Sequence, residues 1–438
     1  MTDWIGTTFE STTGWSHLVD LASIDNRMAG TPGEREAAEA TKTALGQYTR
    51  NARIDSFPVT RWDREIAHVE TPSGLESGIG LPMSPDDDAT GELVSLGYGL
   101  PDDFETTDLD GRVVLVRSDV PEYVDRRIHR REKYYRAVDA GAVGFVFQNH
   151  VEGGLPKTGS VGTSDGGVGE IPAVGVSKEV GSRLERNYDG TDITVSVSAT
   201  ISDSESHSVH AELGPRTDEE ILLTSHLDAH DISEGAMDNG AGTAMLVEVA
   251  RALSNRESRL ETKLHLIAFG AEEVGLQGST RDAAERNLET VSAVVNLDGV
   301  LAARTLSVDV NGFDGFEPAV EAVSERFDHP IEVRPTYEPH SDHWPYVERG
   351  VPGCFVSSST DETGRGWGHT PADTLDKLDV RTFREQSILV SELLLNLAQS
   401  DRRIPNVSQS EIAAALEEAG EAEAMRVTGD WPYENVDT

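Results

Sequence analysis

The second half of the chain alternates short apolar runs with stretches in which apolar residues recur at helical spacing. The apolar runs cover residues 221–223, 264–269, 291–297, 305–310, 331–334 and 353–357, and the amphipathic stretches cover residues 245–253, 316–326 and 380–398. Continuous apolar runs are typical of strands buried on both faces, and amphipathic helices cover such faces. The pattern predicts an α/β fold with a mainly parallel mixed sheet that carries helices on both sides.

The first part of the chain predicts two helices followed by a strand. Residues 15–48 have helical character, but a cluster of Gly and Pro at residues 27–33 interrupts them. Residues 52–69 alternate as in a strand. Residues 72–90 are rich in Gly, Pro, Ser and Asp, which indicates a domain boundary.

Residues 91–200 differ in pattern from the rest of the chain, because they contain short strand candidates joined by glycine-rich connections. The strand candidates are residues 113–116, 143–148, 173–176 and 193–197, with one helix around residues 133–140. We therefore predict an N-terminal part of the main domain (1–75), a β-rich insert domain (76–205), the main domain proper (206–400) and an acidic helical tail (401–438). We expect the tail to pack on the body of the protein.

The composition adds a large negative charge. Lys and Arg total 37 against 78 Asp and Glu, which gives a formal net charge of −41. Such a surplus repels nucleic acid and anionic lipid, and it destabilises a compact chain at low salt. Molar salt shortens the screening length to about 3 Å. The charge therefore favours a protein adapted to a salt-rich cytoplasm, with an ordinary acidic protein as the alternative.

The cysteine count and the N-terminal residues indicate the cellular compartment in which we expect the protein to work. Cys354 is the single cysteine, so the chain forms no internal disulfide and no multi-cysteine zinc site. The first fifteen residues lack a basic region and an apolar core, and no apolar run approaches the roughly 20 residues that span a bilayer. We expect a soluble, cytoplasmic protein without a nucleic-acid or membrane partner; a homo-oligomer is compatible with the sequence.

Polar residues collect where three predicted strands end. They are His226 and Asp228, then Glu272 and Glu273, then Asp298. Parallel sheets bind ligands at the carboxyl ends of their strands. Taken singly, such residues have ordinary explanations, because Asp238 could cap the helix after it and His226 could be a hydrogen-bonded core histidine. The repetition on three successive strands favours a shared site.

A loop at residues 368–374 contributes a further histidine. With it, the chain offers two imidazoles and three carboxylates, which are the N and O donors that borderline divalent metals prefer: His226, Asp238, Glu273, Asp298 and His369. Asp228 lies two residues after His226 on an extended chain, so it can accept the second N–H of that ring. Of the adjacent glutamates, one can bind metal while its neighbour moves protons.

These residues belong to motifs that resemble a known family. SHLDA, MDNGAG, AFGAEEVGLQGS, VNLDGV, SDHWPYVERGVP and HTPADTLDKLD are similar to motifs of the co-catalytic zinc exopeptidases, the aminopeptidase and glutamate-carboxypeptidase family, and RMAGTPGEREAA near the N-terminus also matches. The resemblance covers residues 218–400. It implies the zinc exopeptidase fold, a peptide substrate and two divalent ions, zinc or alternatively Co²⁺ or Mn²⁺.

The resemblance also implies a role for each residue. His226 and Asp298 would hold one ion, Glu273 and His369 the other, and Asp238 would bridge them. Glu272 would be the general base, and Asp228 the partner of His226. Asp342 and His343 would brace the site rather than bind metal. Tyr337 is our choice for stabilising the oxyanion, with Tyr346 as its rival and a packed ring with a bonded hydroxyl as the ordinary reading of both.

The class of peptidase stays open between two activities. An aminopeptidase receives a free ammonium group, whereas a carboxypeptidase needs a cation such as Arg365 for a terminal carboxylate. We favour an aminopeptidase over a glutamate-carboxypeptidase-like enzyme. A glutaminyl cyclase, which uses one metal, and a binding protein that has lost its chemistry are less compatible with the full residue set.

The insert has a resemblance of its own. Its segments DLDGRVVLVRSDV, YYRAVDAGAVGFVFQNH and GSVGTSDGGVGEIPAVGVSKEVG are similar to a protease-associated domain. That resemblance implies a β-rich domain that shapes access to the active site, and a purely stabilising insert is the alternative.

Overall fold

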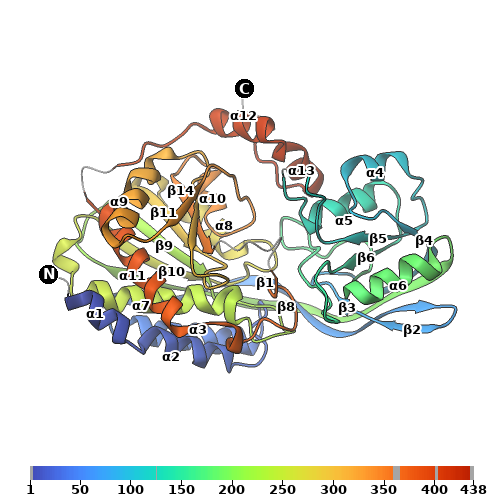
Figure 1. The fold of residues 1–438 in the computed structure, drawn as a ribbon, viewed down its shortest axis with the longest axis horizontal. Coiled ribbons are helices and arrows are strands. Elements are labelled where there is room, and N and C mark those ends of the chain that lie inside the picture. Colours follow the sequence, from blue (N-terminus) through green and yellow to red (C-terminus); the bar gives the residue numbers. More distant parts are fainter. Residues whose placement is uncertain (1–2, 125, 359–365, 400–402, 435–438) are drawn as a thin grey trace.

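A computed structural model describes residues 3–124, 126–358, 366–399 and 403–434. Its strands form one sheet of fourteen strands that runs through both halves of the molecule (Figure 1). Within the described residues no helix combines the length and the apolar character needed to cross a membrane.

The main domain holds one end of this sheet. Its strands are β8 (Asp192–Leu213), β9 (Glu220–His226), β10 (Lys263–Phe269), β11 (Val291–Leu297), β12 (Leu306–Asp309), β13 (Ile331–Arg334) and β14 (Gly353–Ser358), in the order β13-β12-β14-β11-β9-β10-β8. The four central strands, β14, β11, β9 and β10, are parallel. The mainly parallel mixed sheet predicted from the apolar runs is confirmed.

Helices cover both faces of that sheet. They are α1 (Asp3–Glu10), α2 (Thr13–Ala22), α3 (Pro32–Leu45), α7 (Ala241–Ser254), α8 (Gln277–Glu285), α9 (Glu317–Phe327), α10 (Trp344–Val347) and α11 (Val380–Leu397). Along β9, Ile221 and Leu223 belong to the large core shared with α7 and α11, whereas Leu222 belongs to a second core shared with α8 and α10. A strand with period-two side chains thus buries both of its faces, which explains its continuous apolar sequence.

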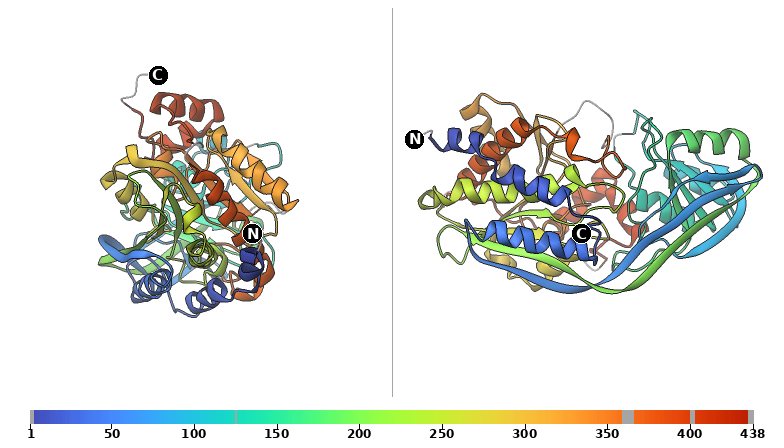
Figure 2. Two further views of the ribbon diagram at one scale, coloured as in Figure 1. Left: turned by 90° about the vertical axis from the view of Figure 1, so that its left-hand side faces the viewer. Right: turned by 90° about the horizontal axis from the view of Figure 1, so that it is seen from below.

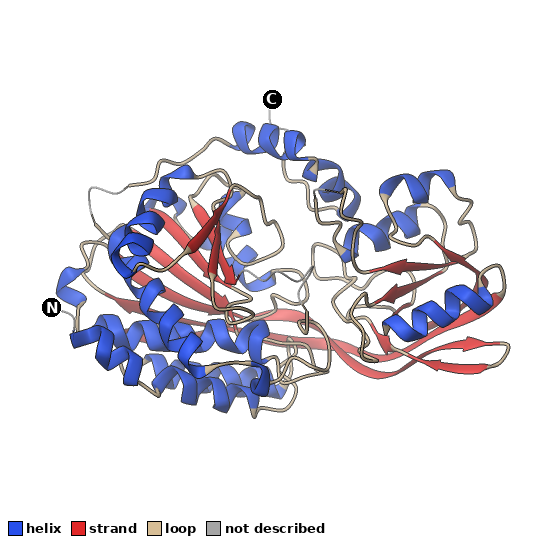
Figure 3. Cartoon of the chain, in the orientation of Figure 1, coloured by secondary structure: helices blue, strands red, loops and turns tan. Residues whose placement is uncertain are grey.

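The insert occupies the other end of the sheet. It contains β2 (Gly74–Ser77), β3 (Ile79–Gly80), β4 (Asp87–Ser95), β5 (Val113–Arg117), β6 (Gly144–Gln148), β7 (Ala173–Val176), α4 (Pro101–Thr106), α5 (Arg130–Asp139) and α6 (Lys178–Tyr188). Strands β4 to β7 are parallel. The expectation of a β-rich insert with one helix is therefore incomplete, because parallel strands need crossover connections and the described residues of the insert form three helices (Figure 3).

Two long strands join these parts. Strand β1 (Arg50–Thr71) pairs antiparallel with β8 over almost its whole length, and this ribbon runs from the main domain into the insert (Figure 2). β8 also pairs with β10 at one end and with β4 at the other. The limits predicted for the insert, residues 76 and 205, fall inside β2 and β8.

The C-terminal tail contacts both the main domain and the insert. Helix α12 (Gln409–Ala419) buries Ile412 and Leu416 in the large core of the main domain. Helix α13 (Glu421–Thr428) lies against α5 of the insert, and Arg136 of α5 pairs with Glu423 at 2.6 Å. The tail thus packs on the body and bridges the main domain and the insert (Figure 1).

Candidate metal centre

The candidate site lies where three parallel strands end. Strand β9 lies between β10 and β11, and it ends at His226. Glu272 and Glu273 follow β10 within four residues, and Asp298 follows β11 directly. The carboxyl ends of neighbouring parallel strands meet at one edge of a sheet, so the fold brings these residues together.

The predicted donor atoms converge around two imidazoles. His226 Nε2 lies 3.5 Å from Asp238 Oδ1, 3.7 Å from Asp298 Oδ1 and 4.0 Å from Glu272 Oε2. His369 Nε2 lies 3.1 Å from Asp238 Oδ2 and 3.6 Å from Glu273 Oε2. Asp238 therefore presents one oxygen to each imidazole.

Each histidine is oriented by a main-chain carbonyl. His226 Nδ1 lies 3.1 Å from the carbonyl of Asp228, and His369 Nδ1 lies 3.2 Å from the carbonyl of Thr158 in the insert. A carbonyl can only accept, so each Nδ1 donates its N–H. In the neutral ring this leaves the lone pair of Nε2 facing the carboxylates, an arrangement suited to a cation between them.

The Asp228 carboxylate lies beside His226, and its role as the partner of that ring stays a prediction. Its Oδ1 is 3.7 Å from His226 Nδ1, while the main-chain carbonyl of the same residue lies 3.1 Å from that nitrogen. The carboxylate accepts the backbone N–H groups of Glu272 at 3.2 Å and Glu273 at 3.1 Å. Asp228 therefore fixes the turn that carries both glutamates.

Hydrogen bonds also position the other two carboxylates. Asp373 accepts the N–H groups of Met237 at 2.8 Å and Asp238 at 3.1 Å, which ties the Asp238 loop to the loop of His369. Ser341 donates to Asp298 Oδ2 at 2.9 Å and itself accepts from Asn296 at 2.8 Å. The donor set is thus held in place by its surroundings.

Arg27, from the RMAGTPG segment, supports the loop that follows β9. Its buried guanidinium donates to the carbonyls of Leu21, Leu227, Glu234 and Gly235 at 2.7–3.2 Å. Pro32 of this segment begins helix α3, as the sequence indicates, whereas helix α2 already ends at Ala22. The arginine itself fixes the stretch between His226 and Asp238.

The site gathers several buried carboxylates, whose negative charges repel one another unless a positive charge lies nearby. Burial, opposed by His226 and reinforced by Glu273 and Asp298, holds the pKa of Glu272 well above its usual value. Burial raises the pKa of Glu273 to about 7, against the opposing effect of His369. Burial disfavours the charged form of His226, yet the surrounding carboxylates, Glu272 first, hold its pKa well above its usual value. Divalent cations would satisfy this need, so the residues fit a metal centre.

A cavity of about 560 Å³ opens in front of these residues. Glu272, Glu273, Asp298 and His369 line its floor, and residues of the insert and of the tail, among them Arg130 and Trp431, line its walls. His129 of the insert and His340 of the main domain also line the cavity, and their rings stack with centroids 4.0 Å apart. A substrate in this cavity would contact the main domain, the insert and the tail.

Several predicted residues lie outside this arrangement. The ring of Tyr337 packs on the large core, its hydroxyl lies against Gly312, and it does not line the cavity. The hydroxyl of Tyr346 donates to Asp282. The structure therefore brings neither tyrosine to the centre, and the oxyanion role of Tyr337 stays a prediction. Asp342 and His343 are buried beside the site, and Arg365 lies outside the described residues.

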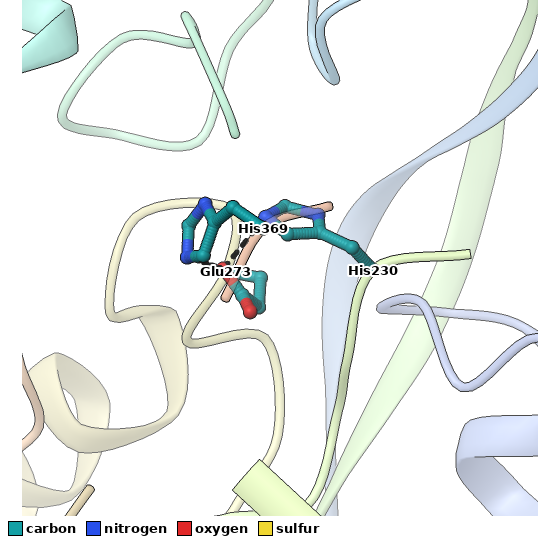
Figure 4. Close-up of side chains that lie close together, drawn as sticks. All are labelled: His230, Glu273 and His369. Atoms are coloured by element: carbon teal, nitrogen blue, oxygen red, sulfur yellow. Dashed lines mark ion pairs between the residues drawn. The ribbon is translucent and has the colours of Figure 1, made fainter. Parts of the chain in front are cut away.

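Sequence reasoning missed one histidine next to the centre. His230 Nε2 lies 2.9 Å from Glu273 Oε2, and the two imidazoles of His230 and His369 flank that carboxylate (Figure 4). A signal was available, because His226, Asp228 and His230 are spaced by two residues and so share one side of an extended chain. The contribution of Thr158 had no such signal, since it depends on how the insert docks.

The fold and the donor set define a class of protein, the α/β metallohydrolases. Comparisons with known proteins narrow this class. Residues 208–394 match the family described as Peptidase family M28, and residues 89–184 match the PA domain. Leucine aminopeptidase 2 of Arthroderma otae is 30% identical over 366 residues, which cover 77% of this chain and 70% of that protein.

Two bacterial aminopeptidases are similar over nearly the whole chain. Aminopeptidase YwaD of Bacillus subtilis is 25% identical over 420 residues, or 93% of this chain and 89% of that protein. The solved aminopeptidase from Aneurinibacillus sp. strain AM-1 has a TM-score of 0.68 and 26% identity, and the match covers 92% of this chain and 97% of that one. This chain therefore belongs to peptidase family M28 and carries a PA domain; it is a metallopeptidase.

Proposed function

We propose that this metallopeptidase is an aminopeptidase that uses two divalent ions, most simply zinc, and a glutamate general base. The observation that carries the proposal is the placement of Asp238, whose two oxygens each face one imidazole while Glu272 remains beside them. The relatives named above are aminopeptidases, which favours the same activity here.

The donors divide into two groups around Asp238. His226 and Asp298 would hold one ion, and Glu273 and His369 the other. Asp238 would bridge the pair, since two neighbouring dications repel strongly without a shared anion. When bound, such ions lower the pKa of a water molecule and polarise the scissile carbonyl.

Glu272 is the group left to move protons. Its side chain lines the cavity and keeps 10% of its surface exposed, compared with 4% for Glu273. The Asp228 carboxylate accepts the backbone N–H groups of Glu272 and Glu273 and so fixes the turn from which both side chains extend. Glu272 would take the proton of the attacking water and deliver it to the leaving amine.

Two arginines of the cavity walls are poor candidates for the cation that a carboxypeptidase needs, which favours an aminopeptidase. Two of the arginines that line the cavity already face carboxylates, Arg131 with Asp430 at 2.7 Å and Arg127 with Glu338 at 3.7 Å. Their charge is therefore largely balanced by the protein itself. A carboxypeptidase would need a cation reserved for the terminal carboxylate of its substrate.

The insert would shape access to the centre. We propose the division into a catalytic domain, residues 1–75 and 206–400, and an insert, residues 76–205, with β1 and β8 common to both. Residues of the insert line the cavity, and Thr158 holds His369. Both observations favour a role in substrate selection and site assembly over a purely stabilising one.

The activity can be tested with three matched substrates. We expect zinc-loaded protein to cleave leucine p-nitroanilide with a kcat/KM at least about tenfold above that of its N-acetyl derivative, because a hydrogen bond to a charged group contributes about 1.5–3 kcal/mol. An N-blocked dipeptide with a free carboxylate should be the poorest substrate. Metal removal by a chelator should abolish the cleavage, and zinc should restore it.

The outcomes separate the alternatives. Faster cleavage of the N-blocked dipeptide would indicate a carboxypeptidase. Protein that binds two ions and cleaves none of the three substrates would indicate a binding protein. Activity that survives complete removal of metal, verified by mass spectrometry, would contradict the metal-dependent mechanism.

We also propose that the protein works in a salt-rich cytoplasm. With a net charge of −41, its melting temperature should rise between about 0.1 M and about 1 M KCl, over which the screening length falls from about 10 Å to about 3 Å. Sucrose of equal osmolality, which stabilises folded proteins without screening charge, serves as the control. A melting temperature that responds to sucrose and not to KCl would contradict the adaptation.

A further inference from the structure

A third imidazole lies beside the proposed metal centre. His230 Nε2 is 2.9 Å from Glu273 Oε2, and its ring centroid is 4.6 Å from that of His369, with the two planes inclined by 74° (Figure 4). Nitrogen and oxygen atoms of His230, Glu273 and His369 all lie within 4.8 Å of one another. The three side chains therefore point at one small volume.

Both nitrogens of His230 are buried without a hydrogen-bond partner among the described residues. The side chain is only 3% exposed, and the contact with Glu273 lacks hydrogen-bond geometry. A buried polar group left without a partner is destabilising, so such a histidine usually has a ligand, a water or an ion. Glu273 Oε1 is also buried without a hydrogen-bond partner among the described residues.

The spacing of the donors suits a single ion. Two ligands that each lie about 2.0–2.2 Å from a zinc ion are separated by about 3 Å at a right angle and by about 3.5 Å at wider angles. The observed separations from Glu273 Oε2 are 2.9 Å to His230 Nε2 and 3.6 Å to His369 Nε2. Both separations are therefore compatible with one ion between these side chains.

The position of His230 favours a metal ligand over a substrate contact. Glu273 and His369 line the cavity, but His230 does not. The next residue, Asp231, is held by Arg64 of β1 through contacts of 2.7 and 2.9 Å, which fixes the backbone on which His230 stands. The imidazole thus contacts Glu273 without lining the cavity.

We propose that His230 is a third side-chain ligand of the ion held by Glu273 and His369. The inference rests on the proposed two-ion centre. With the shared Asp238, that ion has four protein donors, whereas the ion at His226 and Asp298 has three. A set of four protein ligands is typical of closed, tightly binding sites, and a set of three leaves a position for water or substrate. The two ions would therefore differ in affinity and in task.

Metal titration of the full-length protein tests this difference. We expect metal-free wild-type protein to bind Co²⁺ in two calorimetric steps of unequal affinity. In His230→Gln the tighter step should weaken by at least about tenfold, since even groups one layer outside a metal contribute tenfold to hundredfold in affinity. The visible absorption of the Co²⁺-loaded variant should change as well, because one imidazole leaves the coordination sphere.

A matched variant controls for the loss of a buried imidazole. His265 is buried too, but it lies near the start of β10, contacts Glu220 at 3.1 Å and lies outside the donor clusters. His265→Gln should leave both binding steps and the Co²⁺ spectrum unchanged. Weakening of the same step in both variants would overturn the assignment.

X-ray absorption of the zinc-loaded wild-type protein needs no variant. The proposal predicts three imidazoles for two zinc ions, and two imidazoles for two ions would overturn it. If the wild-type protein binds no divalent ion, the two-ion centre itself fails. If it binds two ions and His230→Gln binds them with unchanged affinity, only the role of His230 fails.

Discussion

Replacing Glu272 with glutamine is expected to lower kcat by about 10³-fold, within the range of about 10²–10⁴ that a positioned general base contributes. The substitution keeps the size of the side chain and removes its ability to accept a proton. Because the proposed ligands are other residues, the variant should still bind two ions. Metal content by mass spectrometry and kcat on leucine p-nitroanilide give the two readouts.

The neighbouring glutamate provides the contrast. Glu273→Gln changes a side chain of the same type one residue away, but it removes a proposed ligand, so this variant should lose metal together with activity. Glu272→Gln with unchanged kcat, or with the same loss of metal as Glu273→Gln, would rule out the division of labour between the two residues.

Replacing Arg27 with methionine is expected to lower the free energy of unfolding by about 3 kcal/mol, because several of the four carbonyls it satisfies would be left unpaired at about 1–3 kcal/mol each. Methionine retains much of the side-chain volume, so the effect isolates the hydrogen bonds. A loss of this size should lower the melting temperature by about 5–10 °C. Thermal unfolding at a fixed salt concentration measures it.

Arg53→Met is the matched control. Arg53 is about half exposed and pairs with the exposed Asp55 at 3.2 Å. Exposed ion pairs contribute at most about 1 kcal/mol, so this variant should melt close to the wild-type protein. Equal melting temperatures for both arginine variants would mean that the loop after β9 does not depend on Arg27.

The sequence was most informative where local pattern and tertiary burial coincide. The predicted strand at residues 291–297 coincides with β11, and that at residues 264–269 matches β10 to within one residue, because a strand buried on both faces needs an unbroken apolar run. The convergence of His226, Glu273 and Asp298 followed from the same logic, since the ends of parallel strands share one edge.

The remaining features depend on contacts that no local pattern encodes. Helix α6 was missed because its apolar positions are few and it begins just after a short strand. The length of β8 was underestimated because its exposed middle is polar and is stabilised by pairing with β1. Thr158 and Arg27 reach the centre only through the docking of distant segments, which spacing along the chain cannot reveal.

The paired strands β1 and β8 make the insert structurally inseparable from the catalytic domain. No flexible linker connects the two parts through this route, because the connection is itself a ladder of backbone hydrogen bonds. Trimming the insert at either predicted limit would cut through β2 or β8 and leave unpaired edges, which are prone to associate with other chains. Anyone who shortens this peptidase, or transplants its insert, would have to carry both arms of the ribbon intact.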